Sequence, residues 1–139
     1  MSKAREYEGD GIVVSYELRR CIHAAKCVHG LPEVFDPDRR PWIDPSGSDA
    51  DRIAAVVERC PTGALTYRRT DGGPAEEAPA PYIRTAPDGP VYVQGSIELR
   101  DADGQVYWTG TRAALCRCGA SKNKPFCDNT HLDIGFEAP

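Results

Sequence analysis

Large apolar side chains are scarce in this sequence. Its 139 residues include only three Phe, two Trp and one Met, and the apolar fraction of 40% counts six cysteines. A hydrophobic core alone barely stabilises a domain shorter than about 70 residues, and such domains usually need a metal, a disulfide or a partner. If the chain forms two small domains, its cysteines are the obvious means of stabilising them.

Long apolar segments are also missing. The N-terminus, MSKAREYEGDG, is charged and has no apolar core of about 7–15 residues like that of a signal peptide. Nothing later approaches the roughly 18 apolar residues that a membrane span requires. We therefore expect a soluble protein in a reducing compartment, the cytoplasm. Clustered cysteines there more often bind metal or perform redox chemistry than form disulfides.

The charge pattern favours no particular partner. The formal net charge is −4, and the sequence shows neither a basic stripe nor a cationic amphipathic helix. We therefore expect neither nucleic acid nor a membrane surface as a partner. A nucleotide or flavin motif is missing as well, because the glycine pair at Gly72 and Gly73 is not followed by a helical pattern.

The segment 71–81, DGGPAEEAPAP, has no hydrophobic periodicity and is rich in Gly, Pro, Ala and Glu. Such a composition is typical of a semi-stiff linker. It predicts an N-terminal domain over residues 1–70 and a C-terminal domain over residues 82–139. Each half holds three of the six cysteines.

The N-terminal half predicts three short strands and one main helix. The strands are expected at residues 12–16, 41–43 and 64–67. Apolar residues from Ile53 to Cys60 recur at helical spacing, after a capping signal formed by Ser48 and Asp51. Pro61 is expected to stop this helix one residue after Cys60.

The C-terminal half predicts short strands separated by turns. They are expected at residues 91–93, 97–99, 106–108 and 113–115, with turn dipeptides at Asp88-Gly89 and Asp103-Gly104. The fold class is therefore α+β, with a small N-terminal domain built on one helix and a small β-rich C-terminal domain.

Residues 116–131, CRCGASKNKPFCDNTH, hold three cysteines and a histidine. Iron and zinc both bind thiolate and imidazole, but a C-x-C pair is tighter than the usual zinc loops. Gly119 relaxes the backbone beside Cys116 and Cys118, while Cys127 and His131 lie four apart, on one face of a helical turn. Two thiolates on one iron, with a thiolate and an imidazole on the other, describe a 2Fe–2S cluster.

These residues resemble the CDGSH iron–sulfur domain over roughly residues 85–137. The resemblance is carried by Cys116-Arg117-Cys118, Ser121, Lys124-Pro125-Phe126, the Cys127-to-His131 run, and the flanking Gly89-Pro90-Val91, Gly95, Leu115 and Gly135-Phe136. It implies a 2Fe–2S cluster bound by Cys116, Cys118, Cys127 and His131. One position departs from the family, because its usual glycine is Asn129 here; Asn tolerates the same turn conformations.

The single histidine ligand has chemical consequences. Imidazole can be protonated, so a cluster held by His131 is easier to lose or tune as the pH falls. It also raises the reduction potential relative to four thiolates. Lys122 and Lys124 either set the local charge or are simply solvated, and Ser121 either donates a hydrogen bond to a cluster sulfur or forms a turn.

The N-terminal half has Cys21, then Cys27 after five residues, and a distant Cys60-Pro61. Bacterial ferredoxins use C-x2-C-x2-C and a distant C-P. Residues 10–69 resemble the divergent mono-cluster ferredoxin domain. The resemblance rests on four segments: Arg20-Cys21-Ile22-His23, Leu31 to Asp36, Pro41-Trp42-Ile43 and Cys60 to Leu65.

The middle ligand of the ferredoxin run falls at Ala24, which has no donor atom. Three cysteines suit a 3Fe–4S cluster, which we favour on ligand count. A 4Fe–4S cluster needs a fourth ligand from solvent, His23 or His29. His23 is also suited to hydrogen-bonding a sulfide or a loop carbonyl, and His29 fits a plain loop residue.

Three aromatic residues of this half, Phe35, Trp42 and Tyr67, are candidates for a shield that keeps water from the cluster. They are equally suited to form the small core. The two roles are compatible, because burial is one of the factors that set a cluster's potential.

Taken together, the sequence predicts a two-cluster electron-transfer protein whose partner is a reductase or an acceptor enzyme. The alternative is a redox- or pH-responsive sensor, or a protein that stores clusters or transfers them to an apo acceptor. Structural zinc sites fit the spacing less well. An enzyme requires a Cys–His nucleophile pair, and no cysteine remains after both clusters are built, so we expect none. A monomer and a homodimer both remain open.

Overall fold

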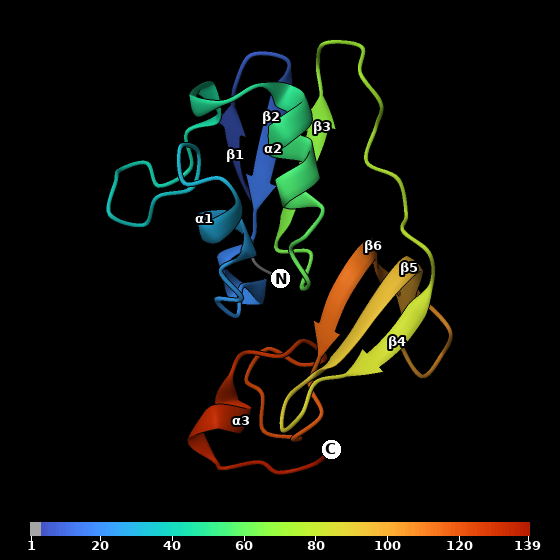
Figure 1. The fold of residues 1–139 in the computed structure, drawn as a ribbon. Coiled ribbons are helices and arrows are strands. Elements are labelled where there is room, and N and C mark those ends of the chain that lie inside the picture. The colour runs from blue at the N-terminus through green and yellow to red at the C-terminus, as the bar shows by residue number, and fades with distance from the viewer. Residues whose placement is uncertain (1–3) are drawn as a thin grey trace. The chain divides into compact units, whose positions relative to one another are not determined.

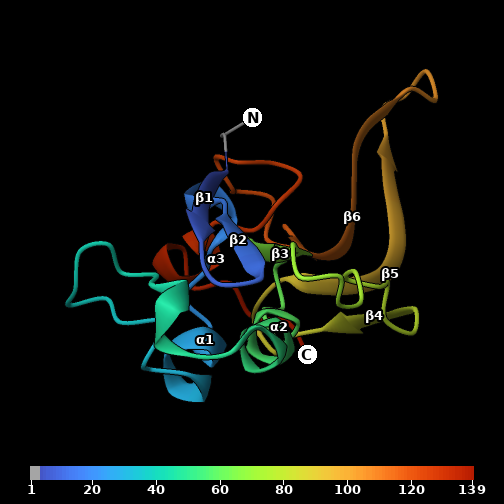
Figure 2. The same cartoon turned by 90° about the horizontal axis from the view of Figure 1, so that it is seen from above.

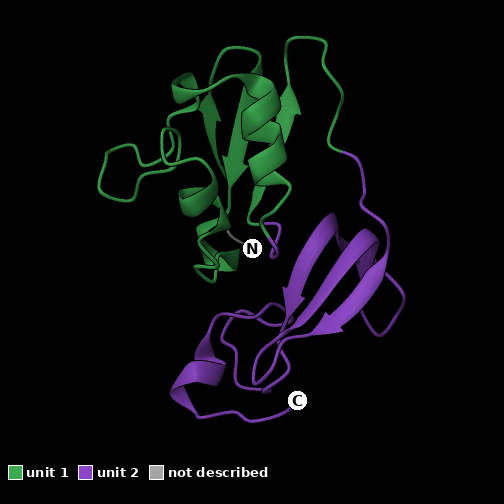
Figure 3. Ribbon diagram, viewed as in Figure 1, with its two compact units in different colours: residues 1–60, 64–76 green, residues 61–63, 77–139 purple. Residues whose placement is uncertain are grey.

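The structure, a computed structural model, describes residues 4–139. Residues 1–3, with which the predicted N-terminal domain starts, lie outside the described residues. The chain forms two compact units (Figure 3): unit 1 comprises the residues up to 60 together with 64–76, and unit 2 comprises 61–63 and 77–139. The main division, between residues 76 and 77, falls inside the segment predicted to be a linker.

Unit 1 is a three-stranded antiparallel sheet with a helix packed on one face (Figure 1). The strands are β1 (Arg5–Glu8), β2 (Ile12–Tyr16) and β3 (Leu65–Arg69), with β2 in the centre. The strands predicted at 12–16 and 64–67 are thus present, the second shifted by one residue at its start. Ile12, Val14 and Tyr16 alternate along β2 and belong to the core of this unit.

The helix α2 (Ala50–Val57) supplies the other side of this core through Ile53, Ala54 and Val57. Its start differs from the prediction, because the cap is Asp49, whose Oδ1 accepts a hydrogen bond from Arg52 N at 2.8 Å. It also ends earlier than predicted, at Val57.

The early end of α2 has a local cause. A proline disfavours helical backbone in the residue before it, and Pro61 follows Cys60. The last turn tightens, so that Arg59 N donates to Val56 O and Cys60 N to Val57 O, each at 3.0 Å. Cys60 therefore lies in the turn between the helix and β3.

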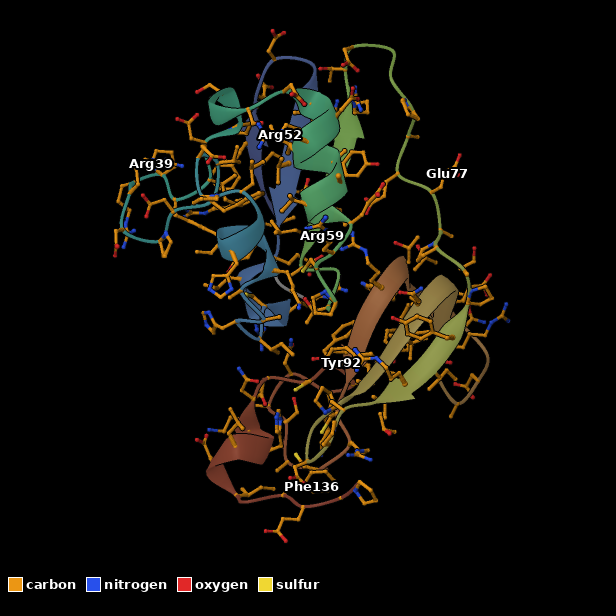
Figure 4. The ribbon with its side chains drawn as sticks, viewed as in Figure 1. Arg39, Arg52, Arg59, Glu77, Tyr92 and Phe136 are labelled. Carbon is orange, nitrogen blue, oxygen red and sulfur yellow. The ribbon has the colours of Figure 1, made fainter. Side chains whose placement is uncertain are left out.

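The region between Cys21 and α2 is mostly loop. It contains the short helix α1 (Lys26–Gly30). One 3₁₀ turn, Leu18–Arg20, precedes this region, and another, Pro45–Gly47, lies near its end. The predicted strand at 41–43 is wrong: only an isolated bridge joins Phe35 to Ile43. Arg39, labelled in Figure 4, fixes this loop by donating from Nη2 to Val34 O at 2.7 Å. The backbone pairs only around this bridge, where Asp36 N donates to Trp42 O and Asp44 N donates to Val34 O, each at 2.8 Å, and Arg39 adds to these bonds.

Unit 2 is built on a second three-stranded antiparallel sheet, of β4 (Tyr82–Thr85), β5 (Val91–Arg100) and β6 (Val106–Leu115). Figure 2 shows the long β5–β6 hairpin. The four short strands predicted here are thus two long ones. The irregularity at Gly95, which has φ of 126°, lies between Gln94 and Ile97 and explains why the pattern breaks in the middle of β5.

The segment after β6 folds back onto the sheet. Cys116 N donates to Pro125 O, and Cys127 N donates to Ala114 O, each at 2.8 Å. The buried ring of Phe126 meets Trp108 edge to face, with centroids 5.3 Å apart. These contacts close the loop and bring its first and last cysteines to the same end of β6.

Helices and two small antiparallel sheets confirm the mixed α and β content that the sequence predicts. Within residues 4–139, no helix has the length and apolar character needed to cross a membrane.

Candidate iron–sulfur sites

The four residues predicted to bind the 2Fe–2S cluster line one pocket of unit 2. Its empty volume is about 170 Å³, including open solvent. The side chains meet as two pairs: Cys116 Sγ lies 3.9 Å from Cys118 Sγ, and Cys127 Sγ lies 3.5 Å from His131 Nδ1. This matches the expected pairing of ligands, although no three His, Cys, Asp or Glu side chains among the described residues come close enough to hold one metal ion.

Backbone donors surround the sulfurs of this pocket. Gly119 N donates to Cys116 Sγ at 3.3 Å, and Ala120 N donates to Cys118 Sγ at 3.4 Å. A third N–H, from Asn129, lies 3.5 Å from the sulfur of Cys127. Such donors stabilise a thiolate, the form of cysteine that binds iron. The donor set therefore fits a 2Fe–2S cluster.

Two cysteines of the pocket differ in their acidity. Burial opposes ionisation of Cys116, but backbone hydrogen bonds from Ser121 and Gly119 outweigh it. With further help from Cys118 and the charge of Lys124, these contacts lower the pKa of Cys116. Burial raises the pKa of the Cys127 thiol. Cys116 therefore gives up its proton more readily than an ordinary cysteine.

The turn before His131 differs from the sequence prediction. The helix α3 (Thr130–Asp133) begins only after Cys127, so the two ligands do not share a helical turn. Asn129 takes the left-handed conformation, with φ of 72°, which is the geometry expected of the glycine it replaces. This reversal brings the sulfur and the imidazole together without a helix.

Asp128 and Ser121 hold this turn. The Asp128 carboxylate accepts from Lys122 N at 2.9 Å and from both the backbone N–H and the hydroxyl of Thr130. Burial opposes its ionisation, yet these hydrogen bonds lower the pKa of Asp128 to about 2. The buried Ser121 hydroxyl donates to Phe126 O at 2.6 Å, which is the turn-forming role.

The sequence reasoning missed Arg117, which lies between two predicted ligands. Its guanidinium donates to four backbone carbonyls, those of Ala86, Gly89, Ala138 and Pro139. The ring of Phe136, labelled in Figure 4, lies 5.3 Å from its charged carbon. The only sequence signal for this role of Arg117 was its place between Cys116 and Cys118, because alternate residues of an extended segment point in opposite directions.

In unit 1, the three cysteines come from three separate segments. Cys21 follows the first 3₁₀ turn, Cys27 lies in α1, and Cys60 lies between α2 and β3; all three pack against the core of this unit. Burial raises the pKa of Cys27 to about 11, and the nearby Cys60 and Cys21 add to this rise. The three cysteines therefore share the surroundings of one core, and their assignment as ligands stays a prediction. None of the six cysteines, all of them in the described part of the chain, forms a disulfide.

The two histidines of this region, His23 and His29, are exposed. The loop around Ala24 is unusual, because His23 and Ala25 have φ of 60° and 62°. The assignment of His23 as a further ligand stays a prediction.

The core role predicted for three aromatic residues is confirmed, because Phe35 belongs to the core of unit 1 and Trp42 and Tyr67 pack against it. Their role as a shield of the cluster stays a prediction. The ring centroid of Phe35 lies 6.0 Å from that of Trp42, and Tyr67 donates its hydroxyl to Glu58 at 2.6 Å. The ring against the other side of Trp42 is Tyr16, with centroids 4.9 Å apart.

Tyr16 is the second residue that the sequence reasoning missed. It belongs to the core of unit 1, against which Cys21, Cys27 and Cys60 also pack. Burial, together with these neighbours, raises the pKa of Tyr16 well above its usual range. The period-two pattern of β2 carried a usable signal, since it turns Tyr16 inward, where a buried hydroxyl needs a partner.

The fold and these two sites define an iron–sulfur protein with two domains. Residues 7–70 match the family described as divergent 4Fe-4S mono-cluster, and residues 88–132 match the family described as iron-binding zinc finger, CDGSH type. The chain is 39% identical over 64 residues to the uncharacterized protein YjdI of Escherichia coli (strain K12), a match spanning 46% of this chain and 84% of YjdI; YjdI of Escherichia coli O157:H7 gives the same values.

The chain therefore belongs to the divergent 4Fe-4S mono-cluster family and carries a CDGSH-type domain in addition. The CDGSH-type domain implies a 2Fe–2S cluster, and the mono-cluster domain implies an iron–sulfur cluster of its own.

Proposed function

We propose that the chain is a small electron carrier that exchanges electrons with a partner redox enzyme. The observation that supports this most is the presence of two separate thiolate sites, one in each unit, each matching its own iron–sulfur family. When bound, such clusters supply one-electron redox chemistry. The described residues show no other chemical constellation with a comparable donor set.

In unit 2, we assign iron binding to Cys116, Cys118, Cys127 and His131. The cysteine pair would hold one iron and the Cys127–His131 pair the other, as the two short distances suggest. Cys127 is buried, whereas Cys116, Cys118 and His131 are only partly buried. These three partly buried ligands are therefore the natural contacts for electron exchange with a partner.

In unit 1, we assign iron binding to Cys21, Cys27 and Cys60. The family description names a 4Fe-4S cluster, but Ala24 leaves this chain one thiolate short. We propose a 3Fe–4S cluster on ligand count, with a four-iron cluster completed by solvent or His23 as the alternative.

A second function rests on His131. Its imidazole is partly exposed, and an imidazole ligand that gains a proton no longer binds metal. A sensor, or a protein that gives its 2Fe–2S cluster to an apo acceptor, would use this property. In either case we propose a carrier rather than an enzyme, and the cytoplasmic location stays a prediction.

Electron paramagnetic resonance of the full chain, as isolated and after stepwise reduction, tests the proposal. We expect a signal from an oxidised 3Fe–4S centre and, after reduction, a separate signal from a 2Fe–2S centre. Cys27→Ser should remove the first signal alone, and Cys127→Ser should alter the second alone. Protein that contains zinc and no labile sulfide would refute the proposal.

The two functions are separated by incubating the loaded protein with an apo acceptor. Electron carriage predicts that both clusters stay in place while an added redox partner is reduced. Transfer of the 2Fe–2S cluster to the acceptor, faster at lower pH, would instead favour the second function.

A further inference from the structure

The imidazole of His131 lies between Cys127 and residues 86–90, a loop ahead of β5 that we call the backing loop. Its Nδ1 atom lies 3.5 Å from Cys127 Sγ, on the side of the predicted cluster. Its other nitrogen, Nε2, faces Gly89, where a Cβ atom would lie 3.6 Å from it. Gly89 is buried and lines the same pocket as the four predicted ligands. The ring is therefore confined on two sides.

The backing loop is held from two directions. Arg117 donates to the carbonyls of Ala86 and Gly89, at 2.7 and 2.8 Å. Asp88 N donates to Ala138 O at 2.7 Å, and Ala138 N donates to the Asp88 carboxylate at 2.8 Å. Hydrogen bonds that involve a charged group are stronger than those between neutral groups. The loop therefore resists moving away from the ring.

Glycine at position 89 leaves room for this ring. Its φ is not in the left-handed range, so the backbone conformation alone does not require glycine. A Cβ there would contact His131 Nε2 and Pro87 O, each at 3.6 Å, and would lie 3.2 Å from Ala86 Cβ. A methyl group is thus nearly accommodated, whereas atoms beyond it would enter space that these neighbours already bound. Because the loop is held, the ring would have to give way.

We propose that Gly89 is a positioning residue for the 2Fe–2S cluster. Because it has no side chain, the backing loop can lie against the outer edge of His131 and keep Nδ1 directed toward the cluster. This inference rests on the proposed function. A ligand has to be held within about 0.5 Å of its working geometry by the residues that pack around it. A larger side chain at position 89 should therefore weaken the hold of His131 on iron.

Gly89→Ala and Gly89→Val separate contact from displacement. The methyl group of Ala needs a shift of only a few tenths of an ångström at Ala86. Gly89→Ala should therefore lose its 2Fe–2S cluster at a rate within about threefold of wild type. Val adds two carbons beyond Cβ, so decay of the visible absorbance of this cluster should become about 10- to 100-fold faster, as expected of an overpacked contact.

A spectroscopic measurement distinguishes displacement of the ring from general loosening of the fold. In the full, cluster-loaded chain with ¹⁵N-labelled histidine, electron nuclear double resonance of the reduced 2Fe–2S centre reports the coupling of the iron-bound nitrogen. This coupling should match wild type in Gly89→Ala and be reduced or lost in Gly89→Val. The signal of the N-terminal cluster should be the same in all three proteins.

Two double variants test the route of the effect. In His131→Cys/Gly89→Val no imidazole is present to be displaced, so Val should not speed cluster loss relative to His131→Cys alone. In Ala86→Gly/Gly89→Val the closest neighbour of the new Cβ is removed, but loss should stay fast because the ring is still displaced. Recovery of the wild-type rate there would refute the inference, because a conflict within the loop would then be responsible. Acceleration by Val in the His131→Cys protein would refute it as well.

Gly89→Ser keeps the inference testable if Gly89→Val does not fold. It adds a single atom beyond Cβ, so cluster loss should be faster, and the nitrogen coupling smaller, than in Gly89→Ala; equal values would overturn the inference. Wild-type protein without a 2Fe–2S signal would refute the proposed function. A wild-type cluster whose nitrogen coupling is unaffected by Gly89→Val would refute only the role of Gly89.

Discussion

Replacing Arg117 with Gln should loosen the pocket of unit 2 without touching a ligand. The guanidinium donates to Ala86 O at 2.7 Å and Gly89 O at 2.8 Å, ahead of β5. It also donates to Ala138 O at 3.2 Å and Pro139 O at 2.9 Å, in the C-terminal segment. One side chain therefore connects the loop that bears Gly89, a residue of the pocket wall, to the end of the chain.

The size of the effect follows from the burial of these bonds. Three of the four, to Ala86, Gly89 and Ala138, are partly buried, and the bond to Pro139 is exposed. Counting about 1 kcal/mol net for each partly buried bond gives about 2–3 kcal/mol for local opening. Since about 1.4 kcal/mol corresponds to a factor of ten, the open state should become roughly 30- to 150-fold more populated.

Two assays report this opening. Hydrogen exchange measured by mass spectrometry should rise at Asp88, whose N–H donates to Ala138 O at 2.7 Å, and at Ala138, whose N–H donates to the Asp88 carboxylate at 2.8 Å. Decay of the visible absorbance of the 2Fe–2S cluster should accelerate in parallel. Circular dichroism should remain unchanged, because the sheet itself is not altered.

Arg100→Gln is the control for the loss of a positive charge in unit 2. Its partner is Glu98, at 2.6 Å, and their side chains are 58% and 53% exposed. An exposed pair of this kind contributes about 0–1 kcal/mol. Equal rates of cluster loss in Arg100→Gln and Arg117→Gln would refute the reasoning, because general electrostatics and not the four carbonyl contacts would then be responsible.

Two further predictions concern acid sensitivity. His131→Cys should keep a cluster, lower its potential and reduce the loss of the cluster in acid, because a protonatable ligand is replaced by a thiolate; potentiometry and absorbance decay measure these effects. The pKa of Asp128 is lowered to about 2, so its contribution to stability is present above about pH 4 and lost only as the pH falls toward 2. Asp128→Asn should therefore speed cluster loss by a constant factor above about pH 4, and a factor that changes with pH in that range would contradict this assignment.

The residues of the C-terminal site could be predicted because their spacing is local. Cys116 and Cys118 lie two residues apart in a loop, and the reversal at Asn129 brings Cys127 close to His131. The residues within and beside each pair therefore determine how its two side chains meet. The expected helix was wrong in detail, since the turn precedes α3. A four-residue spacing is compatible with a helix and with a tight turn, and only the backbone of Asn129 distinguishes the two.

Tertiary contacts decide the features that the sequence did not predict. The loop at 41–43 has the composition of a strand, but its backbone pairing with residues 34–36 is limited to one bridge, and Arg39 donates to the carbonyls of Val34 and Trp42 on both sides of it. Arg117 likewise contacts residues distant in the chain, at Gly89 and Ala138. An arginine in a sequence gives no indication of which carbonyls it will reach.

The cysteines of the two candidate sites have different surroundings, and this difference has an experimental consequence. In unit 2 the sulfurs receive backbone N–H groups of their own loop, from Gly119, Ala120 and Asn129, which no side-chain substitution removes. In unit 1 the three predicted ligands pack against the side chains of the core. A core substitution in unit 1 should therefore change the potential of the N-terminal cluster. Because each set of contacts belongs to its own unit, a substitution that shifts both potentials together would show that the units are coupled.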